Sequence, residues 1–154
     1  MSTTPQLTVS EYFAGIGLMR LGLEQGGWKT VFANDIDRKK REMYEHHFGR
    51  TPAVMPDDIH LLDVADVPTA SLATASFPCN GLSLAGARRG LAGEHSSAFW
   101  GFIRILEEMG ARRPQIILLE NVTFGEALLA VNRLGYSVDA FIIDASRFGL
   151  RDVS

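Results

Sequence analysis

One short stretch of the chain combines a cysteine with residues that suit a loop. Cys79 is the only cysteine among the 154 residues, and it stands between Pro78 and Asn80 in the stretch SFPCNGLSLAG. A thiolate is a strong nucleophile, although a lone cysteine is more often buried and inert. Pro78 fixes the backbone directly after a predicted strand, and the residues that follow are small or polar. These flanks favour a functional cysteine.

A carboxyl group stands at the end of another predicted strand. Glu120 follows the apolar run IILL and precedes Asn121. At the end of a buried strand, desolvation can keep a carboxyl group protonated so that it donates a proton. The alternative is a structural hydrogen bond to a neighbouring loop, and the residue types alone leave both interpretations open.

The segment FAGIG places Gly15 and Gly17 directly after a predicted strand. Such glycines let a ligand approach the backbone, and the following helix offers free N–H groups at its start. The dinucleotide-binding fingerprint is not met, because Arg20 stands where its third glycine is required. A nucleoside ligand without a pyrophosphate would suit this turn, and a plain tight turn is an equal alternative.

Two acidic residues follow at places that suit such a ligand. Asp35 ends the second predicted strand, roughly 20 residues after the glycines, where an acid can accept hydrogen bonds from both hydroxyls of a ribose. Asp37 could instead cap the next helix. Asp58, in the segment PDDIHLLD, could accept a hydrogen bond from an adenine amino group, although a lone acidic loop is usually solvated.

Strand and helix patterns alternate along the chain, and they must position these residues. The predicted strands are residues 8–13, 30–33, 72–77, 116–119 and 138–143, and the predicted helices are residues 18–25, 38–47, 96–109 and 126–134. This order predicts an α/β fold, a parallel sheet covered by helices on both faces. Ligands of such sheets bind beyond the carboxyl ends of the strands, so the polar residues that follow each strand should meet at one edge.

Composition limits the class of protein. Apolar residues make up 46% and charged residues 21%, as in an ordinary globular protein of one domain. No apolar run reaches the ~18 residues that cross a membrane, and the N-terminus lacks a signal-peptide pattern. A single cysteine excludes an internal disulfide and a cysteine-rich zinc site, and the 4 histidines show no metal-ligand spacing. We expect a cytoplasmic protein without a metal or a membrane partner.

The charge is not that of a typical nucleic-acid-binding protein, because the net charge is −3. Basic residues gather at residues 38–41, 88–89 and 112–113. The first and last of these groups are predicted to be solvated surface charge. Arg88 and Arg89 are more interesting, since they lie in the same predicted loop as Cys79.

Taken together, the segments FAGIG, NDID, DDI, FPCNGLSLAG and ENV closely resemble, in this order, the DNA cytosine-C5 methyltransferases. The resemblance covers about residues 9–150. It implies a Rossmann-like sheet that binds S-adenosylmethionine. It also implies methyl transfer to C5 of a cytosine in DNA, after the Cys79 thiolate has added to C6.

The resemblance implies a role for each motif residue. Cys79 matches the nucleophile and Pro78 the proline beside it, while Glu120, in a motif with Asn121 and Val122, matches the glutamate that contacts N3 and the exocyclic amine of the base. The cofactor residues that the resemblance implies are Phe13, Gly15, Gly17, Asp35, Ile36, Asp58, Ile59 and Phe77. In the family the base is flipped out of the duplex. The loop at residues 80–94 would close over it, and the expected nucleic-acid contacts in that loop are Ser83, Arg88 and Arg89.

The chain departs from the family pattern at several positions. Leu18 stands where the family often has glycine, Glu11 where it often has aspartate, and Asn80 where it commonly has glutamine. After ASRFGL the family continues with a Gln-x-Arg-x-Arg stretch that supplies an active-site arginine, whereas this sequence reads RDVS.

Other parts of the family pattern are also absent: a final strand, which lies between those matching residues 116–119 and 138–143, the target-recognition domain and a C-terminal helix. We therefore expect residues 1–154 to be a partial catalytic, cofactor-binding domain without its last strand. Methyl transfer by such a domain would need a missing C-terminal part or a second chain that supplies the arginine motif and a recognition domain.

The sequence leaves two other functions open. One branch of the family methylates transfer RNA with the same motifs, so a transfer-RNA cytosine-C5 methyltransferase is one alternative to a DNA methyltransferase. The other is an inactive remnant that binds the cofactor, or nothing. The absent arginine motif favours the remnant, whereas the intact Cys79 and Glu120 count against it.

Overall fold

The structure is a computed structural model that describes residues 6–52, 54–77, 97–120 and 125–143. Its sheet consists of β1 (Thr8–Tyr12), β2 (Lys29–Asn34), β3 (Val54–Met55), β4 (Leu72–Ala75) and β5 (Ile116–Leu119). The strand order is β3-β2-β1-β4-β5, and every neighbouring pair is parallel. Strands β2 and β3 therefore lie on one side of β1, and β4 and β5 lie on the other side. The point where the order reverses, between β1 and β4, is where such sheets bind ligands.

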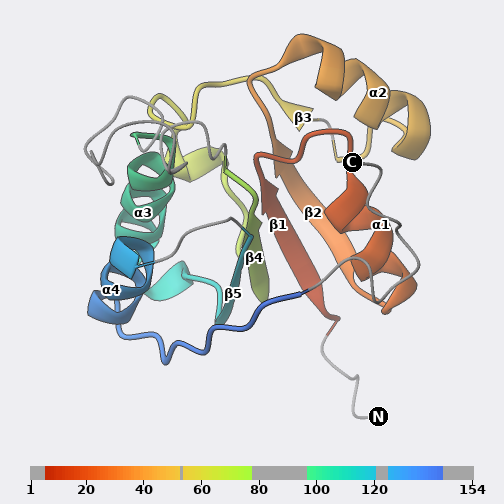
Figure 1. Cartoon of the computed structure of the whole chain (residues 1–154). Helices are drawn as coiled ribbons and strands as arrows, with labels where there is room; N and C mark the ends of the chain where they lie inside the picture. Colours follow the sequence, from red (N-terminus) through yellow and green to blue (C-terminus); the bar gives the residue numbers. More distant parts are fainter. Residues whose placement is uncertain (1–5, 53, 78–96, 121–124, 144–154) are drawn as a thin grey trace, which may run out of the picture.

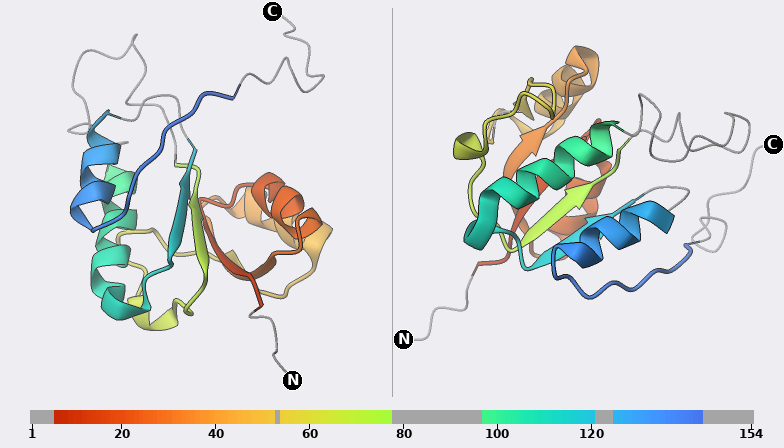
Figure 2. Two further views of the ribbon diagram at one scale, coloured as in Figure 1. Left: turned by 90° about the horizontal axis from the view of Figure 1, so that it is seen from below. Right: turned by 90° about the vertical axis from the view of Figure 1, so that its left-hand side faces the viewer.

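Two pairs of helices cover the sheet. Helices α1 (Leu18–Gln25) and α2 (Arg38–Phe48) lie on one face, and α3 (Ser97–Met109) and α4 (Gly125–Arg133) lie on the other (Figure 1). The left view of Figure 2 shows the sheet between the two pairs. Short 3-10 helices, η1 (Val64–Asp66) and η4 (Gly110–Arg112), complete the connections. The α/β fold predicted from the sequence is confirmed, and the four predicted helices agree with these bounds to within one residue.

The main hydrophobic core lies between the sheet and α3. Phe99, Phe102, Ile103 and Leu106 recur at helical spacing and are all buried, at 4% exposure or less. The ring of Tyr12 in β1 packs edge-on against Phe102, with the ring centroids 5.0 Å apart. Burying a side chain of this size stabilises the fold by roughly 1.5–3 kcal/mol. Helix α3 is therefore a firmly anchored element, on which neighbouring loops can be fixed.

Residues 138–143 do not form the strand that their apolar pattern predicts, so this prediction is wrong. Val138, Phe141, Ile142 and Ile143 are 39%, 67%, 99% and 67% exposed, in an irregular segment. Within the described residues, β5 pairs with β4 along one edge and with no strand along the other. A strand forms only where a neighbour satisfies its backbone hydrogen bonds, and no strand in the described part of the chain pairs with this segment.

The sequence patterns also miss β3, which has only two residues. Ala33 and Asn34 of β2 pair with Val54 and Met55 of β3. The strand is too short to show the alternation of apolar and polar residues that identifies a strand. Its effect is nevertheless large, because it places the segment that leads to Asp58 beside the carboxyl end of β2.

Candidate functional site

The chain turns sharply between β1 and α1, at the predicted glycine turn. Phe13, Gly15 and Gly17 have φ values of 55°, 58° and 88°, all in the left-handed region. The turn is fixed to the neighbouring strand, since the Ala14 N–H donates to the Asn34 carbonyl at 3.0 Å. A left-handed φ at a residue such as Phe13 costs on the order of 1–3 kcal/mol, and such strain occurs preferentially at ligand sites.

Asp35, at the carboxyl end of β2, joins two of the predicted motifs. Its Oδ2 accepts a hydrogen bond from the Gly15 N–H at 2.8 Å, and its Oδ1 accepts one from the Asp37 N–H at 2.8 Å. The residue is only 6% exposed. Each carboxylate oxygen has two lone pairs, so both can still accept a hydrogen bond from a ligand hydroxyl. Ile36, directly beside it, is 64% exposed and offers an apolar surface.

Asp37 caps helix α2, as the alternative interpretation of this residue predicts. Its Oδ1 accepts hydrogen bonds from the Lys39 N–H at 2.8 Å and the Lys40 N–H at 3.2 Å. These N–H groups, that of Lys40 first, lower the pKa of the Asp37 carboxyl. The two acids of NDID therefore have different roles: Asp37 begins the helix, and Asp35 holds the glycine turn.

Residues 57–62, here called the Asp58 loop, lie next to Asp35. The Asn34 side-chain amide donates to the carbonyls of Met55 at 3.2 Å and Asp57 at 2.9 Å, which fixes the start of the loop on β2. The Asp58 Oδ1 accepts from the His60 N–H at 2.9 Å. Asp58 is half-buried, whereas Ile59 is 5% exposed and belongs to the main core. The glycine turn and Asp35 thus meet at one edge of the sheet, as predicted, and β3 brings the Asp58 loop to the same edge.

Two more predicted site residues follow β4 and β5. Phe77 is buried, and its ring packs edge-on against that of Phe13, with the centroids 6.4 Å apart. The Glu120 N–H donates to the Ala75 carbonyl at 3.1 Å, so the ends of β4 and β5 are adjacent. Glu120 is exposed, which differs from the desolvated carboxyl expected from the sequence, because β5 lies at the edge of the sheet. Six predicted site residues lie outside the described residues: Pro78, Cys79, Ser83, Arg88, Arg89 and Asn121.

A buried network that the sequence patterns do not identify lies beneath the glycine turn. The Tyr44 hydroxyl donates to Glu11 Oε2 at 2.8 Å, and the Arg20 N–H donates to Glu11 Oε1 at 3.2 Å. The Arg20 guanidinium contacts Glu24 at 2.8 Å and lies over the Phe48 ring, 4.4 Å from its centroid. This network ties α1 and α2 to the end of β1.

Burial raises the pKa of Glu11 from its ordinary value of 4.5 to about 7, although the hydrogen bond from Tyr44 opposes the change. Between these two values the folded state binds more protons than the unfolded state, so the free energy of unfolding should fall as the pH rises. The loss is on the order of 3 kcal/mol across this window. We expect Glu11→Gln to remove this pH dependence, because the amide does not ionise.

Denaturant titrations below and above this pH window, on the unsubstituted chain and on Glu11→Gln, measure the difference. Glu107→Gln, which changes an exposed carboxylate on α3, is the matched control and should keep the full pH dependence. The assignment would be wrong if Glu11→Gln showed the same pH dependence as this control.

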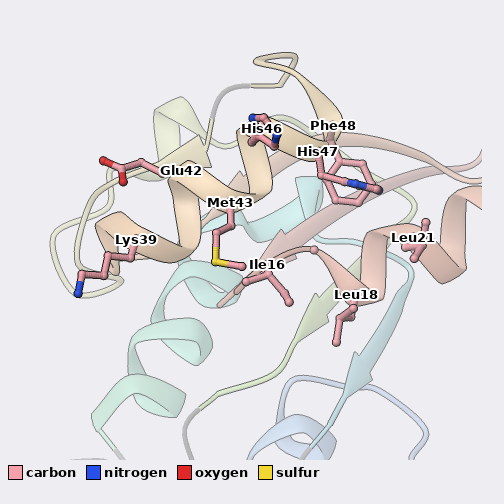
Figure 3. Close-up of a pocket in the computed structure, with 10 residues that line it drawn as sticks. Ile16, Leu18, Leu21, Lys39, Glu42, Met43, His46, His47 and Phe48 are labelled. Atoms are coloured by element: carbon pink, nitrogen blue, oxygen red, sulfur yellow. The ribbon is translucent and has the colours of Figure 1, made fainter.

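A groove of roughly 680 Å³ lies between α1 and α2, apart from most of the predicted site. Figure 3 shows Ile16 and Leu18 on one side and Met43 of α2 on the other. Gly17 is the one predicted cofactor residue in its lining. The groove is therefore a separate apolar surface, beside the edge where the strand ends meet.

Several arginines in the basic groups are not simply solvated, which corrects the sequence-based expectation. Arg41 Nη1 donates to the carbonyls of Asp35 at 2.9 Å and Ile36 at 2.7 Å. Arg112 and Arg113 likewise donate to backbone carbonyls of other elements. Arg38, in contrast, is exposed as predicted. Within the described part of the chain no cluster of residues could hold a metal ion, and no helix is long and apolar enough to cross a membrane.

The fold and the site define a doubly wound α/β domain in which a strained glycine turn, an acid at the end of β2 and a second acidic loop meet at one sheet edge. The family model for C-5 cytosine-specific DNA methylases matches residues 7–152, and the chain belongs to this family.

Individual relatives agree with this assignment. The chain is 36% identical to the type II methyltransferase M.BsuFI of Bacillus subtilis, over 94% of this chain and 36% of the relative. It is 35% identical to the type II methyltransferase M.HaeII of Haemophilus aegyptius, over 91% of this chain and 45% of the relative. The crystal structure of the S. pombe Dnmt2 methyltransferase has a TM-score of 0.65 and 25% identity, over 84% of this chain and 39% of that chain. The chain thus spans less than half the length of these relatives.

Proposed function

We propose that this chain is the cofactor-binding and catalytic part of a methyltransferase that transfers a methyl group from S-adenosylmethionine to C5 of cytosine in DNA. The observation that carries the proposal is the contact between Gly15 and Asp35, which brings the glycine turn and the expected ribose acid together in a chain of this family. The family whose model matches the chain, the C-5 cytosine-specific DNA methylases, supports DNA rather than RNA as the substrate.

The residues at the sheet edge fit the cofactor. A Cβ added at Gly15 would meet no atom of the described residues within 4 Å, so nothing in this part of the chain fills the space above this backbone. Both oxygens of Asp35 are oriented by backbone N–H groups and keep lone pairs for two ribose hydroxyls. Ile36 and Asp58 would contact the adenine. When bound, S-adenosylmethionine supplies an electrophilic methyl group.

The proposed chemistry on the cytosine belongs to this chain's own residues. The Cys79 thiolate forms a bond to C6, and Glu120 holds N3 and the exocyclic amine, so that electron density moves to C5. After C5 has been methylated, it loses its proton, the bond between sulfur and C6 breaks, and the ring double bond and the thiolate are restored. The base must leave the duplex for these contacts, and Ser83, Arg88 and Arg89 would contact the nucleic acid.

The relatives' length bears on how this activity is tested. Because the chain spans less than half of them, we propose that transfer needs the remaining portion of a methyltransferase, in the same chain or as a second one. The test is a labelled-methyl assay of this chain with and without that portion, on duplex DNA and on transfer RNA in competition. We expect label in DNA, dependent on the added portion. Label in transfer RNA alone would favour the RNA methyltransferase. Cofactor binding without any transfer would favour a non-catalytic module.

A further inference from the structure

We propose that Gly101 and Arg104 of α3 are positioning residues for the Asp58 loop, and that they set the preference of the cofactor site for adenine over other purines. This inference rests on the proposed function, in which Asp58 accepts a hydrogen bond from the adenine amino group. It adds two residues on a different helix, neither of which is expected to touch the cofactor.

Arg104 holds the loop through its backbone. Its Nη2 donates to the carbonyl oxygens of Ile59 at 2.9 Å and Leu62 at 2.8 Å. Its Nη1 donates to Glu108 at 2.8 Å, one helical turn further along α3. A planar guanidinium that is oriented by a carboxylate offers its donors in a fixed geometry. Arg104 therefore ties the Asp58 loop to α3.

Gly101 lets the loop pack directly on the helix. A Cβ added at this position would lie 2.6 Å from Ile59 Cγ2 and 3.2 Å from the His60 ring. Glycine is unfavourable inside a helix, and this close approach gives a physical reason for its presence here. Any larger residue would push Ile59, and with it the loop, away from α3.

The position of the Asp58 carboxylate follows that of the loop. The Asp58 Oδ1 accepts a hydrogen bond from the His60 N–H at 2.9 Å. The backbone carbonyl of Asp58 accepts hydrogen bonds from the N–H groups of Leu61 and Leu62 at 2.8 and 3.0 Å. Asn34 holds the other end of the loop on the sheet. With one end fixed on β2, a shift of Ile59 would rotate Asp58 relative to Asp35, so the adenine contact would be lost while the ribose contact stays.

Arg112 offers a matched control. It also donates to two backbone carbonyls, from Nη1 to Val67 at 2.9 Å and from Nη2 to Val64 at 3.0 Å. These carbonyls belong to η1 and the residue after it, and not to the Asp58 loop. Arg112→Leu therefore removes two hydrogen bonds from a guanidinium to backbone carbonyls, as Arg104→Leu does, but from a different loop.

The experiment measures by calorimetry how tightly this chain binds S-adenosylhomocysteine and S-inosylhomocysteine, in which an oxygen replaces the adenine amino group. We expect the unsubstituted chain to prefer the adenosyl compound by about tenfold or more, the usual contribution of one hydrogen bond to a charged group. Arg104→Leu and Gly101→Ala should bring the two affinities to within about twofold of each other, because Asp58 no longer meets the amino group. Arg112→Leu should lower Tm and keep the preference.

The outcomes separate the inference from the function on which it rests. If the unsubstituted chain binds neither compound, with or without the remaining methyltransferase portion, the proposed function fails and the inference fails with it. If it binds and prefers the adenosyl compound, but Arg104→Leu and Gly101→Ala keep that preference, the inference alone is overturned. An equal loss of affinity for both compounds also overturns it, because that is what a purely structural role produces. If Arg104→Leu does not fold, Arg104→Lys, which keeps the charge but has one compact donor group, and Gly101→Ala decide.

Discussion

Replacement of Cys79 by alanine is expected to abolish methyl transfer and to leave cofactor binding unchanged. The C5 atom of cytosine is a weak nucleophile until a thiolate adds to C6, and the chain has a single cysteine that could do this. Loss of an enzyme's nucleophile commonly lowers the rate by about 10⁴-fold or more. The measurement is the labelled-methyl assay on duplex DNA, with the remaining methyltransferase portion supplied.

Two comparisons make this result specific. Cys79→Ser should be as inactive as Cys79→Ala, because a hydroxyl group ionises far less readily than a thiol. Calorimetry with S-adenosylhomocysteine should give the same affinity for both variants as for the unsubstituted chain, which excludes misfolding as the cause. If Cys79→Ala transferred methyl groups at the unsubstituted rate, Cys79 would not be the nucleophile.

Features that depend on local pattern can be predicted from the sequence. The apolar spacing of Phe99, Phe102 and Leu106 identifies α3 and the face that it buries. Gly15 and Asp35 each follow a predicted strand, and parallel strands bring their carboxyl ends to one edge of the sheet. The sequence therefore predicts that these two residues lie close together, and the hydrogen bond between them confirms it.

Features that depend on partners distant in the sequence cannot be predicted in this way. The segment at residues 138–143 has the composition of a strand, but its structure depends on whether a neighbouring strand is present. Arg104 and Arg112 donate to backbone carbonyls 42 to 48 residues away. Because every residue has a backbone carbonyl, the sequence does not show which ones accept these hydrogen bonds. Glu11 stands where the family often has aspartate, whose side chain is one methylene group shorter. Only the fold shows that the Glu11 carboxyl group is buried against Tyr44.

Gly17→Ala is expected to destabilise the fold by about 3 kcal/mol, the sum of a left-handed φ and an overpacked contact. Gly17 has a φ of 88°, and an added Cβ would lie 2.3 Å from Phe48 Cε2 and 2.9 Å from Tyr44 Cδ2. Both rings are tied to the buried network. Phe48 lies under the Arg20 guanidinium, and the Tyr44 hydroxyl is bound to the buried Glu11.

Two other glycines separate these contributions in denaturant titrations. Gly15→Ala places a Cβ at a φ of 58° with no atom of the described residues within 4 Å, so it should show only the backbone cost of about 1–2 kcal/mol. Gly22→Ala, inside α1 and clear of the other described residues by 4 Å, should stabilise the chain by about 1 kcal/mol. If Gly17→Ala cost no more than Gly15→Ala, α2 would move away freely, and the network of Glu11, Arg20 and Tyr44 would not hold the glycine turn. A larger cost at Gly17 means that the packing of α2 fixes the backbone on which the cofactor is proposed to lie.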